Sequence, residues 1–535
     1  MMMKPAPTTS ATKNSYNVRI FLLLFAILIV LGLVGVRLFF LQVVNHGYYQ
    51  ALADGQHNDT DESASPNRGE IYLTSSLDNS QPVLVATNIT KDLVYANERQ
   101  IADPASVAGK LAPILGMDKA EIEDKLSGNS AYYVIKKELD DSVSAQIEAL
   151  DIKGLYLEPQ TMRFYPEGDL ASQVLGFVGY SGDQRVGQYG IEGQYEKELA
   201  GTPAVGPAQP QASGSWTSFL DGLSLPAKKG DDIYLTLDPA IQFKAQEVLK
   251  KTVEAHEAQS ASAIVVNPKT GAVMAMATYP DFDPNNYNQV GDISVYSNQV
   301  LAGDYEPGSI FKAITMAAAL NEHKVTPDTT YEDDGVLKVD DKEIRDSDNK
   351  AHGIQTMTQV LEESLNIGID FAERQIGNDT FKKYVEKFGF GKPVNFELSG
   401  QSAGNVDNLD KKGDIFFATA AYGQGITVTP LQMVQAYTAI ANGGKMMTPY
   451  LVDKVVYPDG TQDVTKPSKG TQVIDSTTAA TLSAMLVSVV ENGHGKSASV
   501  PGYYIAGKTG TAQVAYTDRA GYDPSKSIGS FIGYG

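Results

Sequence analysis

The longest apolar run of the chain lies near its N-terminus and predicts a membrane-spanning helix. Residues 20–36 contain no charged side chain, and the apolar pattern continues beyond Arg37 to Val44. At about 1.5 Å per helical residue, residues 20–44 can span a hydrocarbon core of about 30 Å. The charged residues before the run are all Lys or Arg, so we expect residues 1–19 in the cytoplasm. The bulk of the chain would then face outward from a single-pass protein of the cytoplasmic membrane. A cleaved signal peptide is the alternative, but no small-residue cleavage site follows the run.

Residues 45–230 mix short helical and strand patterns and predict an α and β pedestal domain. Apolar positions three or four apart indicate helices, whereas strict alternation indicates strands. Residues 202–230 break both patterns and are rich in Pro, Gly, Ala and Ser, which predicts a linker. The predicted helices cover 105–115, 118–126 and 143–150, a strand covers 132–136, and a turn leads into a strand at 67–72.

A second domain is expected over residues 231–535. A strand pattern at 233–237 precedes Asp238 and Pro239, which suit the N-cap and the first position of a helix. Strands at both ends and helices between them predict an α+β fold, with an antiparallel sheet flanked by helices. Hairpins are expected from 263–266 with 272–277 and from 503–506 with 512–515, and further helices are expected to begin near 309, 358, 380, 430 and 476.

Composition narrows the possible chemistry. The 535 residues carry a net charge of −21, which disfavours nucleic-acid binding because an acidic surface repels phosphates. The absence of cysteine excludes disulfides, cysteine-ligated metals and a thiol nucleophile. The six histidines show no metal-ligand spacing, so we expect no metal, no cofactor and no Ser-His-Asp mechanism.

The strongest chemical signal is a serine and a lysine three residues apart at a predicted helix start. Pro307 and Gly308 end a loop, and Ser309 and Lys312 open an apolar helix. Residues three apart share a helix face, so the hydroxyl and the amine would lie side by side. A lysine can take the proton of a serine nucleophile when burial or a second cation lowers the pKa of its amine.

Ser-x-x-Lys alone carries little weight, and order along the chain separates it from chance matches. Serine enzymes that react with β-lactams need Ser-x-x-Lys, then Ser-x-Asn, then Lys-Thr-Gly. Only Ser309–Lys312, Ser364–Asn366 and Lys508–Gly510 keep this order with suitable flanks, whereas the triplet 269–271 precedes the nucleophile and fits a hairpin turn. A nucleophile-elbow pattern at 400–404 is not followed by a helix and predicts a surface loop.

With these motifs the chain resembles the class B penicillin-binding proteins. The segment Tyr305–Ser309 is similar to the family's sequence around its nucleophile. Other similar segments are Leu235–Asp238, Thr278–Asn285, Phe388–Gly391, Gly423–Gly425, Thr429–Gln432, Ala441–Gly444 and Ala506–Gln513, with Arg68-Gly69, Arg163–Pro166, Leu175–Gly179 and Gly190–Glu192 in the pedestal.

The resemblance implies a D,D-transpeptidase that cross-links peptidoglycan stem peptides and is a target of β-lactams. It also implies a membrane anchor, a polytopic membrane glycosyltransferase of the SEDS family as partner, and other division or elongation proteins. The Tyr-Glu-Pro-Gly-Ser context favours the septal type. Residues 45–230 leave no room for the additional glycosyltransferase domain of the class A relatives.

The resemblance also assigns roles to matching positions. Ser309 would be acylated, Lys312 would take its proton and Ser364 would relay a proton to the leaving amine. Asn366 would hold Lys312 and the substrate amide. Lys508 would keep Lys312 neutral and attract the substrate carboxylate, Thr509, Gly510 and Thr511 would form the strand that binds it, and the N–H groups of Ser309 and Thr511 would form an oxyanion hole.

The end of the chain departs from the family pattern. The family continues past residues 530–533 with another strand and a helix, so the domain 231–535 is expected to lack both. Two other functions stay open. A D,D-carboxypeptidase or β-lactamase would need a base that positions water, and a non-catalytic β-lactam sensor would need a signalling domain, for which residues 1–19 are too short.

Overall fold

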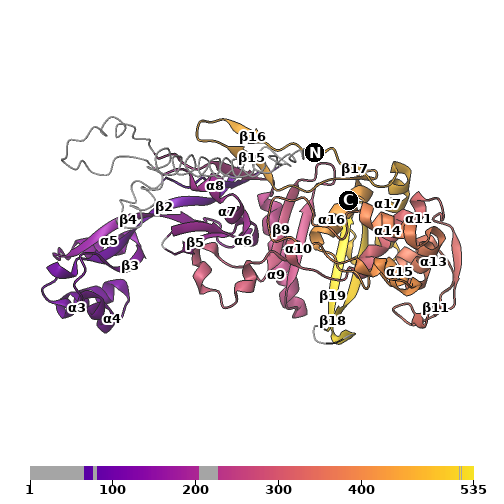
Figure 1. Ribbon diagram of the computed structural model, residues 1–535, viewed down its shortest axis with the longest axis horizontal. Helices are drawn as coiled ribbons and strands as arrows, with labels where there is room; N and C mark the ends of the chain where they lie inside the picture. Colours follow the sequence, from indigo (N-terminus) through magenta and orange to yellow (C-terminus); the bar gives the residue numbers. More distant parts are fainter. Residues whose placement is uncertain (1–65, 76–80, 183, 204–226, 517–518, 520) are drawn as a thin grey trace, which may run out of the picture. The chain divides into compact units, whose positions relative to one another are not determined.

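The computed structural model describes residues 66–75, 81–182, 184–203, 227–516, 519 and 521–535 (Figure 1). The predicted tail at 1–19 and the predicted membrane helix at 20–44 lie outside these residues. Within the described ranges, no helix combines the length and the apolar character needed to cross a membrane. Residues 67–201 and 229–535 pack together as one unit.

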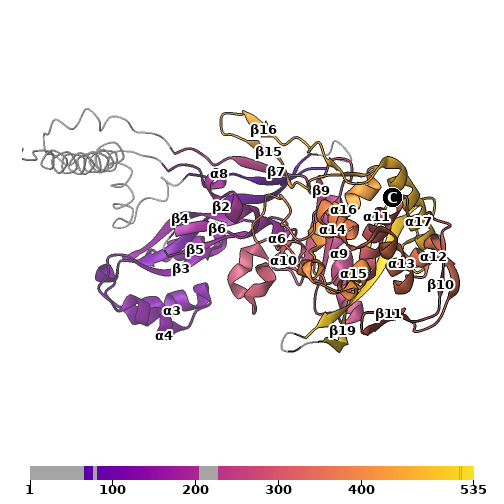
Figure 2. The same cartoon turned by 45° about the vertical axis from the view of Figure 1, so that its right-hand side comes forward.

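A seven-stranded mixed sheet connects the first part of this unit with two later parts of the chain. It contains β1 (Ile71–Leu73), β2 (Val83–Ala96), β3 (Tyr133–Leu139), β4 (Leu155–Phe164), β7 (Asp232–Leu235), β15 (Val452–Val456) and β16 (Gln462–Val464). The order is β16-β15-β7-β1-β2-β3, and β4 also pairs with β2. Strands β1 and β7 are parallel, with Ile71 opposite Ile233, and both residues are fully buried. The later strands β7 and β15 therefore extend the pedestal sheet (Figure 2).

Three short helices pack against the β2, β3 and β4 end of this sheet. They are α3 (Pro104–Leu115), α4 (Lys119–Leu126) and α5 (Asp141–Glu148), which confirms the three helices expected there. Asp103 and Asp118 cap α3 and α4 by accepting backbone N–H bonds, and Gly116 ends α3 in the left-handed conformation. Their apolar faces meet Val94 in a separate small core.

A buried ion cluster joins three of the four pedestal segments that carry the family resemblance. Glu192, at the start of α7 (Gly190–Gln194), accepts from Nε of both Arg68 and Arg163 at 2.6 Å. The Tyr165 hydroxyl lies 3.3 Å from the same carboxylate. The two guanidinium groups hold the pKa of Glu192 below its usual value although burial opposes this. The other elements here are α6 (Ser172–Leu175), β5 (Phe177–Ser181), β6 (Gln184–Gln188) and α8 (Glu196–Ala200).

The second part begins as the sequence predicts. Helix α9 (Pro239–His256) has Asp238 as its N-cap, whose carboxylate accepts from Ala240 N and Ile241 N, and Pro239 occupies its first position. The hairpin of β8 (Ala261–Val266) and β9 (Val273–Tyr279) confirms the expected turn, and α9 packs on β9. The segment that follows contains η5 (Pro284–Gln289), η6 (Ile293–Tyr296) and α10 (Gln299–Ala302).

The largest core surrounds α11 (Lys312–Asn321), whose residues 312–320 are all buried. A helix that is apolar on every side belongs inside a domain, where it can be covered all round. Covering it are α13 (Asn366–Ile376), α14 (Asn378–Lys387) and α17 (Ser476–Glu491), with α12 (Met357–Glu362), α15 (Asp414–Ala421) and α16 (Pro430–Ala441) nearby. The smaller elements are β10 (Thr330–Asp333), β11 (Leu337–Val339), β12 (Lys342–Ile344), β13 (Gly353–Thr356), η8 (Asp407–Asp410), β14 (Lys445–Met446), β17 (Thr471–Gln472) and η9 (Lys496–Ala498).

The expected late hairpin from 503–506 and 512–515 is wrong. One continuous strand, β18 (Ala506–Ala515), pairs with β19 (Tyr522–Tyr534) in a long antiparallel hairpin (Figure 1). Residue 510 is a glycine inside this strand because a side chain has no room there: a Cβ would come within 2.5 Å of Ser530 Oγ. Within the described residues, the β8–β9 and β18–β19 pairs form separate two-stranded sheets, where a single antiparallel sheet was expected. The α+β class itself is confirmed.

Candidate active site

The predicted nucleophile lies on a tight turn against strand β18. Ser309 is half-buried in η7 (Gly308–Phe311), which leads directly into α11. Gly308 has φ +54°, and its N–H donates to Gly423 O at 2.9 Å. A Cβ on Gly308 would come within 2.7 Å of Thr511 O, so glycine lets β18 approach the turn. The hydroxyl therefore sits between the start of a buried helix and the Lys-Thr-Gly strand.

Lys312 is fully buried one turn after Ser309. Its Nζ donates to Ser364 O at 2.5 Å and to Ser364 Oγ at 3.3 Å. Burial lowers the pKa of Lys312 well below its ordinary value, and the positive charge of Lys508 lowers it further, whereas Asp346 opposes the shift. A lysine amine in this environment can be neutral and can accept a proton.

Lys508 reaches the same hydroxyl from β18. It is fully buried, and its Nζ donates to Ser364 Oγ at 3.0 Å and to Thr509 O at 3.1 Å. Burial lowers the pKa of Lys508 to about 8. Segments that lie far apart in the sequence therefore place two amines on one serine.

Ser364 occupies a bend between α12 and α13 and has φ +59°. A non-glycine residue in this left-handed region is uncommon and is worth a functional explanation. The bend brings both the carbonyl and the hydroxyl of Ser364 to Lys312. The left-handed conformation of Ser364 is therefore linked to the contact between the Ser-x-Asn motif and Lys312 of the Ser-x-x-Lys motif.

The side chain of Asn366 is hydrogen-bonded to a backbone carbonyl and not to Lys312. Its Nδ2 donates to Arg345 O at 2.8 Å, and its backbone N–H donates to the carboxylate of Asp346. Among the described residues it forms no hydrogen bond with Lys312. The predicted contact of Asn366 with Lys312 and with the substrate amide stays a prediction.

The remaining predicted residues form part of β18. Gly510 is buried against Ile310 and Ser530, while Thr509 is half-buried and Thr511 is exposed. Alternate residues of a strand face the same side, so Thr509 and Thr511 share a face. This arrangement suits the binding of a carboxylate at the strand, and that role stays a prediction.

Sequence reasoning missed two acidic residues at the site. Glu306 Oε1 accepts from Gly425 N at 3.0 Å and from the Tyr522 hydroxyl at 3.1 Å, and burial raises its pKa. Glu306 connects the turn that carries Ser309 to β19. The only feature of the sequence that could have identified it as a site residue is its place three residues before Ser309. The second is Asp346, which contacts the backbone of α13 and which no motif contains.

The sequence patterns that match catalytic motifs by chance lie in loops or turns. Residues 401–404 form a loop without helix, in which Ser402 Oγ donates to Asp304 at 2.9 Å. The triplet 269–271 forms the turn between β8 and β9. The chain also contains a Ser-x-x-Lys match at 347–350, and all four of these residues are exposed.

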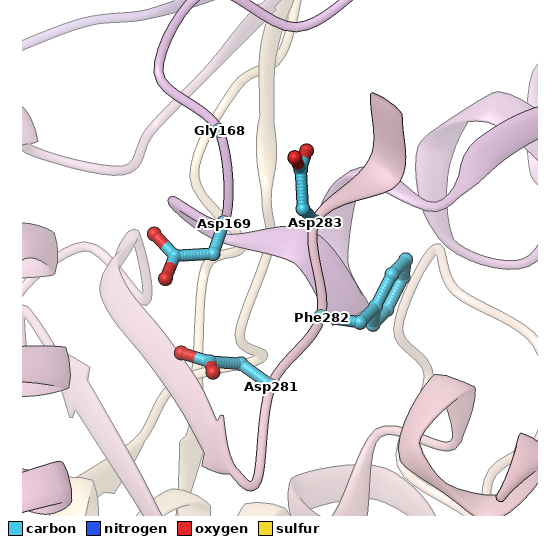
Figure 3. A pocket seen from close by; sticks show the side chains of 5 residues that line it. All are labelled: Gly168, Asp169, Asp281, Phe282 and Asp283. Atoms are coloured by element: carbon cyan, nitrogen blue, oxygen red, sulfur yellow. The ribbon is translucent and has the colours of Figure 1, made fainter. Parts of the chain in front are cut away.

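A separate hollow of about 440 Å³ contains none of the predicted site residues. It is lined by Gly168, Asp169 and residues 281–283, and the carboxylates of Asp169 and Asp281 project toward the same space (Figure 3). Burial raises the pKa of Asp281, and the charge of Asp169 raises it further. This hollow has no nucleophile and no cation among its lining residues.

The fold and site together define a serine acyltransferase of the β-lactam-binding kind, because Lys312 and Lys508 meet at Ser364 Oγ and Lys312 lies one turn after Ser309. The family described as the penicillin binding protein transpeptidase domain matches residues 261–535, and the penicillin-binding protein dimerisation domain matches residues 63–235. The chain belongs to the class B penicillin-binding proteins.

Individual relatives agree with this assignment. Stage V sporulation protein D of Bacillus subtilis is 34% identical over 531 residues, covering 96% of this chain and 79% of the relative. The probable peptidoglycan D,D-transpeptidase PbpC of Pseudomonas aeruginosa is 30% identical over 520 residues, covering 96% and 87%. The crystal structure of penicillin-binding protein 2X from Streptococcus thermophilus superimposes with a TM-score of 0.71 at 26% identity, covering 88% of this chain and 74% of that one.

Proposed function

We propose that this chain cross-links peptidoglycan as a serine D,D-transpeptidase through an acyl-enzyme on Ser309. The observation that carries the proposal is the meeting of Lys312 and Lys508 at Ser364 Oγ, next to the turn that holds Ser309. Family membership supports the reaction and the sensitivity to β-lactams.

In the acylation step, the neutral amine of Lys312 removes the proton of Ser309 Oγ. The oxygen attacks the carbonyl between the two terminal D-Ala residues of a donor stem peptide. As the C–N bond breaks, the proton passes from Lys312 through Ser364 Oγ to the leaving amine of D-Ala. The product is an ester on Ser309, and neither an oxidant nor a metal is needed.

The positive charge of Lys508 serves two purposes in this step. It disfavours protonation of Lys312, which keeps the base available, and it attracts the terminal carboxylate of the donor toward Thr509 and Thr511. The N–H groups of Ser309 and Thr511 stabilise the oxyanion. Losing one such donor typically costs about 10² to 10³ in rate.

In the second step, the amine of an acceptor stem peptide attacks the ester. Lys312 takes a proton from this amine and returns it to Ser309 Oγ as the ester C–O bond breaks. The free serine is restored and a peptide cross-link is formed. β-Lactams react in the first step because their strained amide resembles the D-Ala-D-Ala bond.

We also propose the finer features that the sequence predicts. Residues 20–44 anchor the chain in the cytoplasmic membrane with the catalytic domain outside, which the charge-free run at 20–36 and the apolar residues after Arg37 support. A SEDS-family glycosyltransferase supplies the glycan strands, and the septal type of activity is favoured by the Tyr-Glu-Pro-Gly-Ser context. A relative from Mesostigma viride is described as a peptidoglycan D,D-transpeptidase FtsI homolog, which agrees with this type.

The test of this function is a cross-linking assay with the purified full-length chain and uncross-linked peptidoglycan strands. Digestion and mass spectrometry should reveal cross-linked muropeptide dimers and release of one D-Ala for each cross-link, and Ser309→Ala should yield neither. Release of D-Ala without dimers, in the presence of abundant acceptor, would favour a carboxypeptidase instead.

A further inference from the structure

Two buried aspartates lie near the segment that carries Ser364 and Asn366. Asp333 ends β10 and Asp346 follows β12, and their side chains are 1% and 3% exposed. No arginine, lysine or histidine forms an ion pair with either carboxylate among the described residues. A buried carboxylate without such a partner is costly, so this placement needs an explanation.

Asp346 is bound to the N-terminus of the helix that begins with Asn366. Its Oδ1 accepts from the backbone N–H of Asn366 and, at 3.2 Å, from that of Ile367. The residue at the N-cap position of α13, Leu365, has no side chain that could cap the helix. Asp346 therefore performs the capping from the loop after β12, and the carbonyl of its neighbour Arg345 holds the Asn366 side chain at 2.8 Å.

The other oxygen of Asp346 is buried and has no donor. Burial and the neighbouring carboxyl group of Asp333 raise the pKa of Asp346 to about 6. Asp333 already accepts from the Tyr331 hydroxyl at 2.9 Å and from Gly335 N at 2.7 Å. The oxygen without a donor and the neighbouring carboxyl group both favour the protonated form of Asp346.

Asp346 also acts on the general base. Its negative charge raises the pKa of Lys312, against the effects of burial and of Lys508. The groups that act on Asp346 are Asp333 and Tyr331 on β10 and Lys312 on α11, whereas the neighbouring Arg345 is turned to Glu343 at the surface. The dyad of Asp333 and Asp346 is therefore coupled to both the Ser364–Asn366 segment and Lys312.

We infer that Asp346 is a positioning residue for acylation: it caps α13 to hold the Ser364–Asn366 segment in place, and its carboxylate sets a negative charge near the buried amine of Lys312. This inference rests on the proposed function of Lys312 as the base. It assigns the dyad no contact with the substrate. Asp346 acts through the backbone of α13 and through the charge that Lys312 experiences.

The test measures the second-order rate of acylation of the full-length chain by a fluorescent penicillin between pH 4.5 and 9. Asp346→Asn keeps an oxygen for the two backbone N–H groups and can donate to Asp333, but removes the charge. Its maximal rate should stay within about threefold of wild type, while the rising limb of the profile moves to lower pH because the pKa of Lys312 falls. Asp346→Ala loses the cap as well and should acylate about tenfold more slowly or worse.

Asp475→Ala is the matched control. Asp475 caps α17 by accepting from Thr478 N at 2.6 Å, so its loss weakens a helix without touching the site. This variant should lower the melting temperature and leave the rising limb unchanged. If Asp346→Asn also leaves the rising limb unchanged while wild type shows one, the inference is overturned. If wild type itself shows no rising limb and Lys312→Ala still acylates, the proposed base is wrong instead.

The raised pKa of Asp346 predicts a pH dependence of stability. A carboxyl group whose pKa is raised on folding stabilises the native state most below its unfolded pKa, and this contribution is lost as the pH rises through about 6. Wild type should therefore gain stability relative to Asp346→Asn as the pH falls from 7 to 5, as followed by the melting temperatures of both proteins. A constant difference between the two proteins across this range would contradict the raised pKa of the buried Asp346.

Discussion

Lys312 and Lys508 share one hydrogen-bond acceptor, because their amines lie 3.3 Å and 3.0 Å from Ser364 Oγ. Burial lowers the pKa of Lys312 and the charge of Lys508 lowers it further, whereas burial alone lowers the pKa of Lys508 to about 8. One amine is thereby prepared to act as a base while the other keeps its charge at neutral pH. This relationship leads to predictions that concern the pH dependence, the serine between the lysines, the nucleophile turn and the pedestal.

Replacing Lys508 should move the pH profile of acylation upward. The charge of Lys508 lowers the pKa of Lys312, so Lys508→Ala allows Lys312 to hold its proton to a higher pH. The rising limb should shift to higher pH, and the falling limb of wild type, expected near pH 8 where Lys508 loses its charge, should disappear. Stopped-flow measurements with a penicillin between pH 5 and 10 check both limbs. Lys496→Ala, which removes an exposed lysine, should reproduce the wild-type profile.

Removing the hydroxyl of Ser364 should slow acylation by about 10² to 10³ without unfolding the protein. Ser364→Gly is the better variant because the φ of +59° suits glycine and adds no strain. The second-order acylation rate and the melting temperature together check this result. Ser402→Ala, in the loop that resembles a nucleophile elbow, serves as control and should acylate normally. Normal acylation by Ser364→Gly would contradict the proton relay.

Replacing Gly308 by alanine should abolish most acylation. The left-handed φ costs about 1 to 2 kcal/mol for an L-residue, and the new Cβ would come within 2.7 Å of Thr511 O. The turn and β18 must then separate, which displaces Ser309 from the lysines. Gly460→Ala has a similar φ of +84° with nothing within 4 Å, so it should cost stability alone. Equal labelling of the two variants by a fluorescent penicillin would contradict this reading.

Breaking the pedestal ion cluster should destabilise the protein and leave the chemistry intact. Glu192 is fully buried between Arg68 and Arg163. Glu192→Ala leaves the buried charge of Arg163 uncompensated at a cost of about 3 to 5 kcal/mol, while Arg68 keeps its ion pair with Glu196 at 2.7 Å. Thermal unfolding should show the loss, whereas the acylation rate of the remaining folded protein should match that of wild type. Removing the exposed carboxylate of Glu247, which pairs with Lys244 and Lys251, should change the melting temperature little.

The sequence predicts those parts of the fold that depend on local rules. The start of α9 follows from Asp238 and Pro239, since an acceptor side chain and a fixed φ act on the next few residues only. The β8–β9 hairpin follows from its turn residues in the same way. The late hairpin was wrong because Gly510 suggests a turn locally, whereas close packing against Ile310 and Ser530 requires glycine inside a strand.

The sequence predicts which motifs form the site, but it does not predict how their side chains are arranged in space. Order along the chain selects the three motifs, yet the contact of Lys508 with Ser364 joins residues 144 positions apart, and no local pattern encodes it. The left-handed backbone of Ser364 and the capping of α13 by Asp346 depend on tertiary packing in the same way. Acidic residues outside motifs carry no signal until the fold brings them together.

The most direct test is to locate the covalent adduct. The full-length chain is incubated with a penicillin, digested, and examined by tandem mass spectrometry. The account predicts one acylated residue, Ser309, in the wild type, and no adduct in Ser309→Ala under the same conditions. An adduct on any other residue, or undiminished labelling of Ser309→Ala, would contradict it.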